Sequence, residues 1–146
     1  MARVPTGVTV VTAMGPEGPS GLTANAVVSL SLEPPLMFAC LDRGSRTLRA
    51  VESAGHFGVN VLGGGHESLA RSFATKAPQA DKWDGVMWTA RAGIPALEET
   101  LVWVACELRD VVGGGDHVIV TGAVLEVESA DGEPLVFHDG AYRPLG

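Results

Sequence analysis

Cysteine and long apolar runs are scarce in this sequence, and each shortage excludes a class of protein. Only two cysteines are present, Cys40 and Cys106, and both lie in apolar stretches. They are best interpreted as buried free thiols in a reducing cytoplasm, while a single disulfide between them stays open. No apolar stretch approaches the ~20 residues that a membrane-spanning helix needs, and the first residues, MARVPTG, do not resemble a signal peptide. We therefore expect a cytoplasmic protein with no membrane segment.

Several motifs of nucleotide and metal sites are also missing. No GxGxxG motif follows a predicted strand and no GxxxxGKS/T motif occurs, so neither a Rossmann site nor a P-loop is indicated. The sequence has no CxxC pair and no HExxH motif, and its four histidines are scattered, so a metal site has little support. The formal net charge of −7 argues against nucleic acid or an anionic membrane as the main target.

What the sequence does have is a high apolar content for its length. Its 146 residues are enough for one domain with a sizeable core, so we assign residues 1–146 to a single domain. Hydrophobic residues make up 46% of the chain, and only two lysines, Lys76 and Lys82, add positive charge beside the arginines. Either the core is large, or apolar surface is covered by a partner. Self-association is the simplest form of such cover, and we expect a homodimer.

Alternating apolar and polar residues predict that most of the chain forms β-strands. Helices are expected only as short inserts, one from Ser45 to Gly55 and one after Gly63–Gly65. Residues 75–96 show no clear period and are predicted to be a long surface loop, a feature typical of lids and binding segments. Strands joined mainly by hairpins predict an antiparallel barrel. The predicted strands span residues 6–13, 22–32, 36–41, 57–62, 101–111 and 117–128, and a short hairpin over 135–143 closes the chain.

The start of the helix at Ser45 is a candidate anion site. The preceding residues lead from a strand through a Gly turn into a Ser-capped helix, which presents free backbone N–H groups and the positive end of the helix dipole. Arg43, Arg46 and Arg49 add positive charge around it, and phosphate is the anion that suits it best. The alternative is that Ser45 only caps its own helix, as most such serines do, and that the arginines lie on a solvated face.

Seven blocks of the sequence resemble, in order and spacing, the flavin reductase-like family. This family contains small FMN-binding split-barrel proteins that supply reduced flavin to two-component monooxygenases. The resemblance implies a mainly β fold, a six-stranded antiparallel split β-barrel of Greek-key type with short inserted helices. It also implies a helix ahead of the first block that this sequence lacks, and we expect its loss to affect dimer contacts or pocket closure. The blocks are Thr6–Thr12, Gly21–Leu36, Cys40–Leu48, His56–Leu62, Glu67–Ala74, Gly93–Leu108 and Gly114–Glu128.

The resemblance also implies a set of site residues. Those expected to bind the cofactor are Thr23, Ala24, Asn25, Ala26, Ser29, Cys40, Leu41, Asp42, Ser45, Arg46, Thr47, Phe57, Asn60, Arg71 and Phe73. Within this set, residues 23–29 would follow the isoalloxazine ring and ribityl chain, and residues 45–47 would hold the phosphate. His117 would lie beside the nicotinamide as the catalytic residue. Structural alternatives exist for several of them, with Phe57 and Phe73 as core residues and Arg71 on a solvated helix face.

Taken together, these expectations describe an NADH- or NADPH-dependent flavin reductase. The enzyme would transfer a hydride to FMN or FAD, and the reduced flavin would serve a separate oxygenase. A homodimer is implied, with flavin sites at or near its interface. Two alternatives stay open, because a fold does not fix a function. One is a flavoprotein that keeps FMN tightly bound and reduces another acceptor, and the other is a non-catalytic flavin-binding protein.

Overall fold

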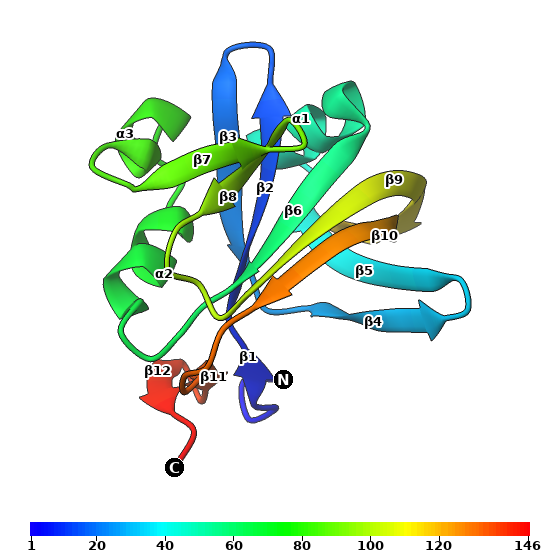
Figure 1. Ribbon diagram of the computed structural model, residues 1–146. Coiled ribbons are helices and arrows are strands. Elements are labelled where there is room, and N and C mark those ends of the chain that lie inside the picture. The colour runs from blue at the N-terminus through cyan, green and yellow to red at the C-terminus, as the bar shows by residue number, and fades with distance from the viewer.

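Strands make up most of the molecule, and three short helices are inserted between them (Figure 1). The computed structural model describes all 146 residues. The predicted mainly β fold class is confirmed. The helices are α1 (Arg46–Ala54), α2 (Glu67–Phe73) and α3 (Gln79–Trp83). The strands are β1 (Thr6–Gly7), β2 (Thr9–Gly15), β3 (Gly18–Ala24), β4 (Val27–Leu32), β5 (Pro35–Asp42), β6 (His56–Val61), β7 (Trp88–Arg91), β8 (Ile94–Leu97), β9 (Val102–Gly114), β10 (His117–Ser129), β11 (Leu135–His138) and β12 (Ala141–Pro144).

Seven strands form one antiparallel sheet in the order β3-β2-β6-β9-β10-β5-β4. Two small sheets, β1-β11-β12 and β7-β8, complete the fold. The large sheet has seven strands where six were predicted, because the strand expected over residues 22–32 is divided. Asn25 and Ala26 separate β3, which pairs with β2, from β4, which pairs with β5.

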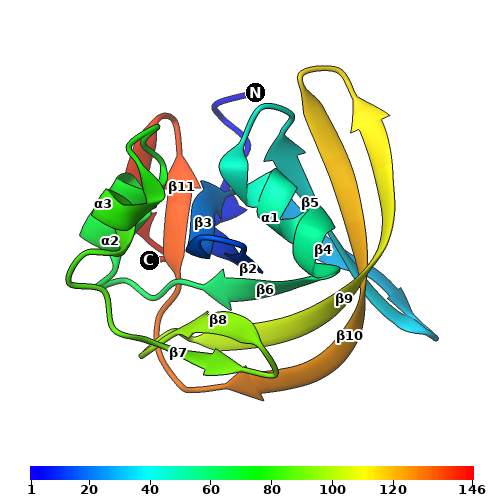
Figure 2. The same ribbon diagram turned by 90° about the horizontal axis from the view of Figure 1, so that it is seen from above.

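This division shows how the sheet closes. β3 and β4 lie at opposite edges of the sheet, yet only Asn25 and Ala26 separate them in the chain. An extended chain advances about 3.3–3.6 Å per residue, so the two edges approach to within roughly 10 Å at this point. The sheet must therefore curl into a barrel, and Figure 2 shows its strands lying around α1. The two edges are joined by no backbone ladder, so the barrel is split along this line.

The barrel interior is filled by one cluster of fourteen buried residues from six strands and α1. Phe57, Leu41 and Val51 are fully buried in it. The packing is tight enough to require glycine at Gly122, because a Cβ there would lie 2.6 Å from Cζ of Phe57. A second cluster of eight residues, which includes Phe73 and Trp83, fixes α2 and α3 on the outside of the sheet.

Helix α1 forms as predicted between Ser45 and Gly55. The Ser45 side chain accepts a hydrogen bond from the backbone N–H of Leu48 at 3.1 Å, so it is the N-cap. Gly55 ends the helix in the left-handed region, at φ 71°, which only glycine adopts easily. Leu48 and Val51 point inward and are buried. The N-terminus of α1 is thereby fixed just after the end of β5.

The loop predicted over residues 75–96 is wrong in part, because this segment contains α3 and the β7–β8 hairpin. Helix α3 has only five residues, too few to show a helical period in the sequence. Tertiary contacts hold it: the Trp83 ring lies 5.1 Å from Phe73 and 5.5 Å from Trp88, edge to face in both pairs.

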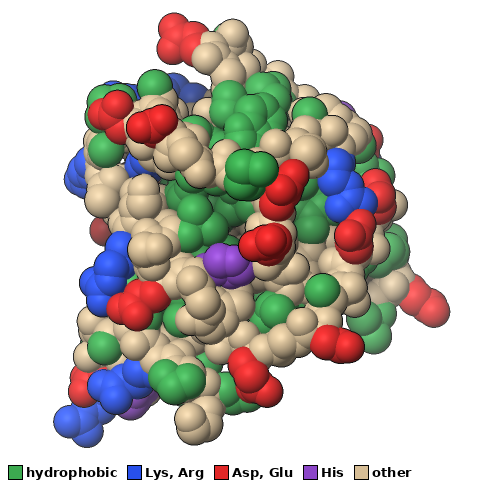
Figure 3. Space-filling view, turned by 60° about the vertical axis from the view of Figure 1, so that its left-hand side comes forward, with side chains coloured by type: hydrophobic (Ala, Val, Ile, Leu, Met, Phe, Trp, Pro, Cys, Tyr) green, Lys and Arg blue, Asp and Glu red, His purple; other side chains and the backbone are tan.

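Acidic side chains are dispersed on one face of the molecule. On the face drawn in Figure 3, acidic and basic side chains are scattered among neutral ones, and apolar side chains gather near the top of the view. None of the helices has the length and hydropathy required to traverse a lipid bilayer.

Candidate functional site

A cleft of about 720 Å³ opens along the split of the barrel. Its walls come from the β3–β4 junction, the end of β5, the first turn of α1, the segment from α2 to α3, and the start of β10. This volume lies within the range of 300–1,000 Å³ typical of sites for small organic ligands. The cleft brings most of the predicted site segments together.

One end of the cleft is positively charged. Ser45, Arg46, Thr47 and Arg49 line it from the first turn of α1. Lys82 of α3 lines it as well and is only 6% exposed. None of the ion pairs in the structure involves these cations. This end therefore combines a helix N-terminus with uncompensated positive charge and suits an anion such as phosphate.

Hydrogen bonds fix the geometry of this charged end. The Thr47 hydroxyl lies 2.9 Å from the Ser20 hydroxyl, in a buried contact that joins α1 to β3. Lys82 donates through Nζ to the carbonyls of Gly21 at 3.4 Å and Phe73 at 3.3 Å. Burial lowers the pKa of Lys82, and the charge of nearby Arg46 lowers it further.

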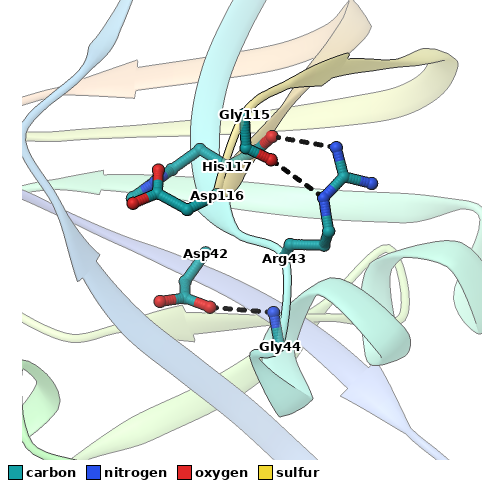
Figure 4. A network of polar contacts seen from close by, with 6 residues as sticks. All are labelled: Asp42, Arg43, Gly44, Gly115, Asp116 and His117. Atoms are coloured by element: carbon teal, nitrogen blue, oxygen red, sulfur yellow. Dashed lines mark hydrogen bonds and ion pairs between the residues drawn. The ribbon is translucent and has the colours of Figure 1, made fainter.

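Arg43 does not contribute to the charged end, in contrast to our expectation. Its Nε donates to the carbonyl of Gly115 at 3.1 Å and its Nη2 to that of His117 at 3.4 Å (Figure 4). Its backbone N–H donates to the carbonyl of Asp116 at 3.0 Å. The guanidinium is thus used to fasten the β9–β10 turn to the end of β5, and Arg43 does not line the cleft.

His117 lines the cleft at the start of β10, next to Asp42 at the end of β5. Its ring is about half exposed, and Nδ1 lies 2.7 Å from Oδ1 of Asp116. This hydrogen bond, together with the charge of the histidine, lowers the pKa of the Asp116 carboxyl. Asp42 accepts from the N–H of Gly44 at 2.8 Å and so shapes the turn into α1 (Figure 4).

Asn25 supplies an unsatisfied polar atom within the cleft wall. Its Oδ1 is buried and has no hydrogen-bond partner, and the residue lines the cleft. A buried acceptor without a donor costs about 1–3 kcal/mol. A ligand with an N–H or O–H group at this position would satisfy it.

Most of the predicted site residues meet at this cleft, and five do not. Ser29 is exposed on β4, and Leu41 and Phe57 are fully buried in the core. Asn60 and Arg71 make other contacts, described next. The eleven predicted residues that line the cleft are Thr23, Ala24, Asn25, Ala26, Cys40, Asp42, Ser45, Arg46, Thr47, Phe73 and His117.

Asn60 and Arg71 have partners elsewhere in the fold. The Asn60 amide donates to the carbonyl of Val10 at 3.0 Å, and its Oδ1 accepts from the N–H of Leu97 at 2.9 Å, so it ties β2 and β6 to β8. Arg71 forms an ion pair of 2.7 Å with Glu67 and lies 5.1 Å above the ring of Tyr142. Neither side chain reaches the cleft.

Sequence reasoning missed the contribution of residues 74–82 to the cleft. Gln79 and Lys82 of α3 line it, together with Ala74, Thr75, Lys76 and Ala77. Lys82 was expected in a surface loop and is buried. The one signal was the unpatterned length of this segment, which is typical of binding segments but identifies no residue.

Known proteins with similar sequences cover nearly the whole chain. A flavin reductase (NADH) from Kitasatospora aureofaciens is 45% identical over 129 residues, which is 86% of this chain and 66% of that protein. The reductase subunit of a flavin-dependent monooxygenase from Mycobacterium tuberculosis is 38% identical over 144 residues, 96% of this chain and 76% of its own length. Some relatives are longer, and the chain spans 44% of one from Rhizobium meliloti that is 39% identical.

Solved structures of similar proteins share the fold. An NADH:FAD oxidoreductase from Streptomyces globisporus C-1027 superposes with a TM-score of 0.92 at 34% identity, over 99% of this chain and 89% of that one. The sequence model of the flavin reductase like domain matches residues 1–146. With a family match over its full length and relatives above 30% identity, this chain belongs to the flavin reductase like domain family.

Proposed function

We propose that the protein is a flavin reductase that uses NADH or NADPH to reduce FMN or FAD. The observation that carries this proposal is the cleft, which is positively charged at the first turn of α1 and is also lined by small residues of the β3–β4 junction and by His117. Family membership supports it, as do relatives named flavin reductase (NADH) and NADH:FAD oxidoreductase.

The cleft residues fit a flavin nucleotide on three counts. The volume suits a ligand of this size. The positive end at Arg46 and Lys82 suits a phosphate. The unpartnered Oδ1 of Asn25 is an acceptor that an N–H of the isoalloxazine ring would satisfy. Few side chains with an acid or base function line the remaining wall, which agrees with chemistry carried by a cofactor.

Each part of the cleft has a distinct role in this proposal. Ser45, Arg46 and Thr47, with the free N–H groups of α1, hold the phosphate. Residues 23–26 and Cys40 lie along the ring, where small side chains allow close approach to the backbone. His117, at the open rim, positions the nicotinamide. The bound flavin itself supplies the electron-accepting ring, and the protein supplies orientation and electrostatics.

The five predicted residues outside the cleft support the site indirectly in this scheme. Leu41 and Phe57 pack the core beneath the end of β5, and Asn60 fixes β6 against β2. We therefore assign them no contact with the ligand. Ser29 and Arg71 face solvent, and we assign them no role in a single chain.

Reduced flavin would then pass to a separate oxygenase, and the reductase would act as a homodimer. Relatives named as reductase components of monooxygenases support the first part. Exposed apolar side chains support the homodimer, because several large ones lie on neighbouring strands of the large sheet. They are Val28, Leu30 and Leu32 on β4, Val111 and Val112 on β9, and Leu125 and Val127 on β10. The cytoplasmic location stays a prediction.

Oxidation of NADH and NADPH by the purified protein, with and without added FMN or FAD, tests the proposed activity. We expect turnover that rises with the concentration of added flavin. A yellow protein that oxidises NADH only when another acceptor is added would indicate a tightly bound flavin instead. Flavin binding with no oxidation of either nucleotide would contradict the proposal and leave a non-catalytic flavin-binding protein.

A further inference from the structure

The turn that leads into His117 is made of residues that give it little rigidity of their own. Gly113 and Gly114 end β9, and Gly115 follows in the left-handed region at φ 75°. Glycine has more backbone freedom than any other residue, so three in succession predict a loose turn. Residues 111–117 are all exposed, so burial does little to hold the turn. His117 therefore needs another support to keep one position at the cleft.

Arg43, in the turn between β5 and α1, supplies that support. Its backbone N–H donates to the carbonyl of Asp116 at 3.0 Å. Its Nε donates to the carbonyl of Gly115 at 3.1 Å and its Nη2 to that of His117 at 3.4 Å (Figure 4). A Cβ at Gly113 would lie 3.1 Å from Nη2, so the guanidinium also lies beside the end of β9. One residue thus holds three successive carbonyls of the segment that contains His117.

Pairing between β5 and β10 does not by itself fix this turn. The ladder between these strands ends at the pair of Asp42 with His117, so Gly115 and Asp116 lie beyond it. Arg43 extends the attachment past that last pair. The ring of His117 depends on the same turn, because its Nδ1 lies 2.7 Å from Oδ1 of Asp116. A shift of Asp116 would therefore move the imidazole as well as the backbone.

Charge recognition does not explain why an arginine stands at this position. Arg43 forms none of the ion pairs in the structure, and it does not line the cleft. Its hydrogen bonds go to neutral carbonyls of the β9–β10 turn. The guanidinium is a fixed planar fork, which can direct two donors to two carbonyls at once. Arg43 is therefore suited to hold one backbone conformation.

We infer that Arg43 is a positioning residue, which fixes His117 in the cleft through the backbone of the β9–β10 turn. It contacts no ligand and acts only through His117. The consequence for the reaction rests on the proposed function, in which His117 positions the nicotinamide. Loss of the Arg43 side chain should then impair the reaction with NADH or NADPH and leave flavin binding unchanged. The fixed position of His117 does not itself rest on the proposed function.

A double-mutant cycle of Arg43→Met and His117→Ala tests this inference, with stopped-flow reduction of FMN by NADH, or by NADPH if the wild type prefers it. Arg43→Met removes every side-chain donor. It should lower the rate constant at limiting nucleotide about fivefold, the factor for one ordinary hydrogen bond, while FMN affinity stays within about twofold. In the His117→Ala background it should have no further effect, because residues that act as one unit are not additive. Arg43→Lys, which keeps the charge without the fork, should show a smaller loss, and it serves in the cycle if Arg43→Met folds poorly.

Arg143→Met is the matched control. Arg143 lies in β12, and its Nε donates to the carbonyl of His138 at 3.3 Å, so it also supports a hairpin, but it does not line the cleft. This variant should reduce FMN at the wild-type rate. A second readout, the ¹⁵N order parameter of the His117 N–H in the apo-protein, needs no activity. It should fall from about 0.85, typical of rigid backbone, toward about 0.6 in Arg43→Met and stay unchanged in Arg143→Met.

Two results would overturn the inference. An unchanged order parameter in Arg43→Met would mean that Arg43 does not fix His117. A wild-type rate of reduction in Arg43→Met, or equal losses with and without His117, would mean that Arg43 only supports the fold. If the wild type oxidises neither NADH nor NADPH while the order parameter falls in Arg43→Met, the proposed function fails and the positioning of His117 stands. If the wild type is active and the two substitutions are additive, the proposed function stands and the positioning role fails.

Discussion

Asp42 and His117 lie directly opposite each other where β5 pairs with β10. This pairing places the residue that leads into α1 beside the residue that opens β10, although they are far apart in the sequence. Both line the cleft, and Arg43 fastens the same region by donating to the backbone of the β9–β10 turn. Backbone pairing therefore holds the first turn of α1 close to His117.

We predict that His117→Ala impairs the use of NADH or NADPH and leaves flavin affinity nearly unchanged. The ring lines the cleft and forms no hydrogen bond or ion pair with Arg46 or Lys82, so its loss should raise the KM for the nicotinamide or slow flavin reduction. Stopped-flow reduction across a range of NADH concentrations measures both effects. His138→Ala is the matched control, because His138 lies in β11 and does not line the cleft. If the variant is reduced at the wild-type rate at every NADH concentration, His117 takes no part in nicotinamide binding or flavin reduction.

Arg46 is the first residue of α1, and Arg43 lies three residues before it. We expect substitution of Arg46 to affect ligand binding and substitution of Arg43 to affect stability. Arg46→Ala should weaken FMN binding about tenfold or more, since it removes a charged contact to phosphate, and should leave the stability of the apo-protein nearly unchanged. Arg43→Ala should lower stability, since it removes two hydrogen bonds to the β9–β10 turn. Flavin titration and thermal unfolding of both variants give the comparison. If Arg46→Ala binds FMN as tightly as the wild type, Arg46 is only a surface charge.

Gly122→Ala should destabilise the fold by about 1–3 kcal/mol, because the interior has no space for the added methyl group. A Cβ at this position would lie 2.6 Å from Cζ of Phe57 and 2.7 Å from Cβ of Cys106. Gly7→Ala is the control, as nothing lies within 4 Å of a Cβ there. Urea denaturation of the two variants measures the difference. Equal stability of both would show that Phe57 can move to make room.

Burial raises the pKa of the Cys106 thiol from 9.0 to about 12. The free energy of unfolding should therefore decline above about pH 9. Between these values the unfolded chain releases the proton while the folded protein keeps it, so stability falls as pH rises. The slope is about 1.4 kcal/mol per pH unit for one group. Cys106→Ala should lose stability at neutral pH, since it leaves a small void, and should show a shallower decline between about pH 9 and 12. Parallel urea curves for both proteins over this range would contradict the assignment.

A homodimer should form through the exposed apolar side chains of the large sheet. Light scattering at micromolar concentration should give twice the mass of one chain. We expect these side chains to form an interface above the ~1,000 Å² that a specific, stable contact buries. Leu30→Glu and Leu125→Glu should shift the mass toward that of the monomer; these side chains are 49% and 54% exposed in the single chain. Met87→Glu, at a 69% exposed residue outside this sheet, should leave the dimer intact. A wild-type protein with the mass of one chain and flavin bound would contradict the homodimer.

Features that depend on neighbours in sequence were predictable, and those that depend on distant strands were not. The limits of α1 follow from Ser45 and Gly55, whose capping roles are local. The break at Asn25 and Ala26 has no local signal strong enough to divide the apolar segment around it. It arises because β3 and β4 pair with different strands.

The same reasoning applies to the charged residues of the site. Arg43 and Arg46 look equivalent in the sequence. They differ because Arg43 donates hydrogen bonds to the β9–β10 turn, a segment distant in the sequence. The burial of Lys82 depends on the contacts of Gln79 and Trp83 with β3 and α2. No pattern within residues 75–96 carries that information. The resemblance predicted eleven of the residues that line the cleft. Leu41, Phe57 and Asn60 are buried and do not line it, so their contact with a ligand stays a prediction.

The two-residue link between β3 and β4 also has a consequence for the order of folding. The β2–β3 and β4–β5 hairpins are local and can form early, but they end up at opposite edges of the sheet. They are held in register only after β6, β9 and β10 have been inserted between them. Contacts between residues far apart in sequence form slowly, because loop closure costs entropy. During synthesis, residues 23–47 therefore leave the ribosome well before the strands that shape them into a cleft, and ligand binding reports that the last strands of the barrel are in place.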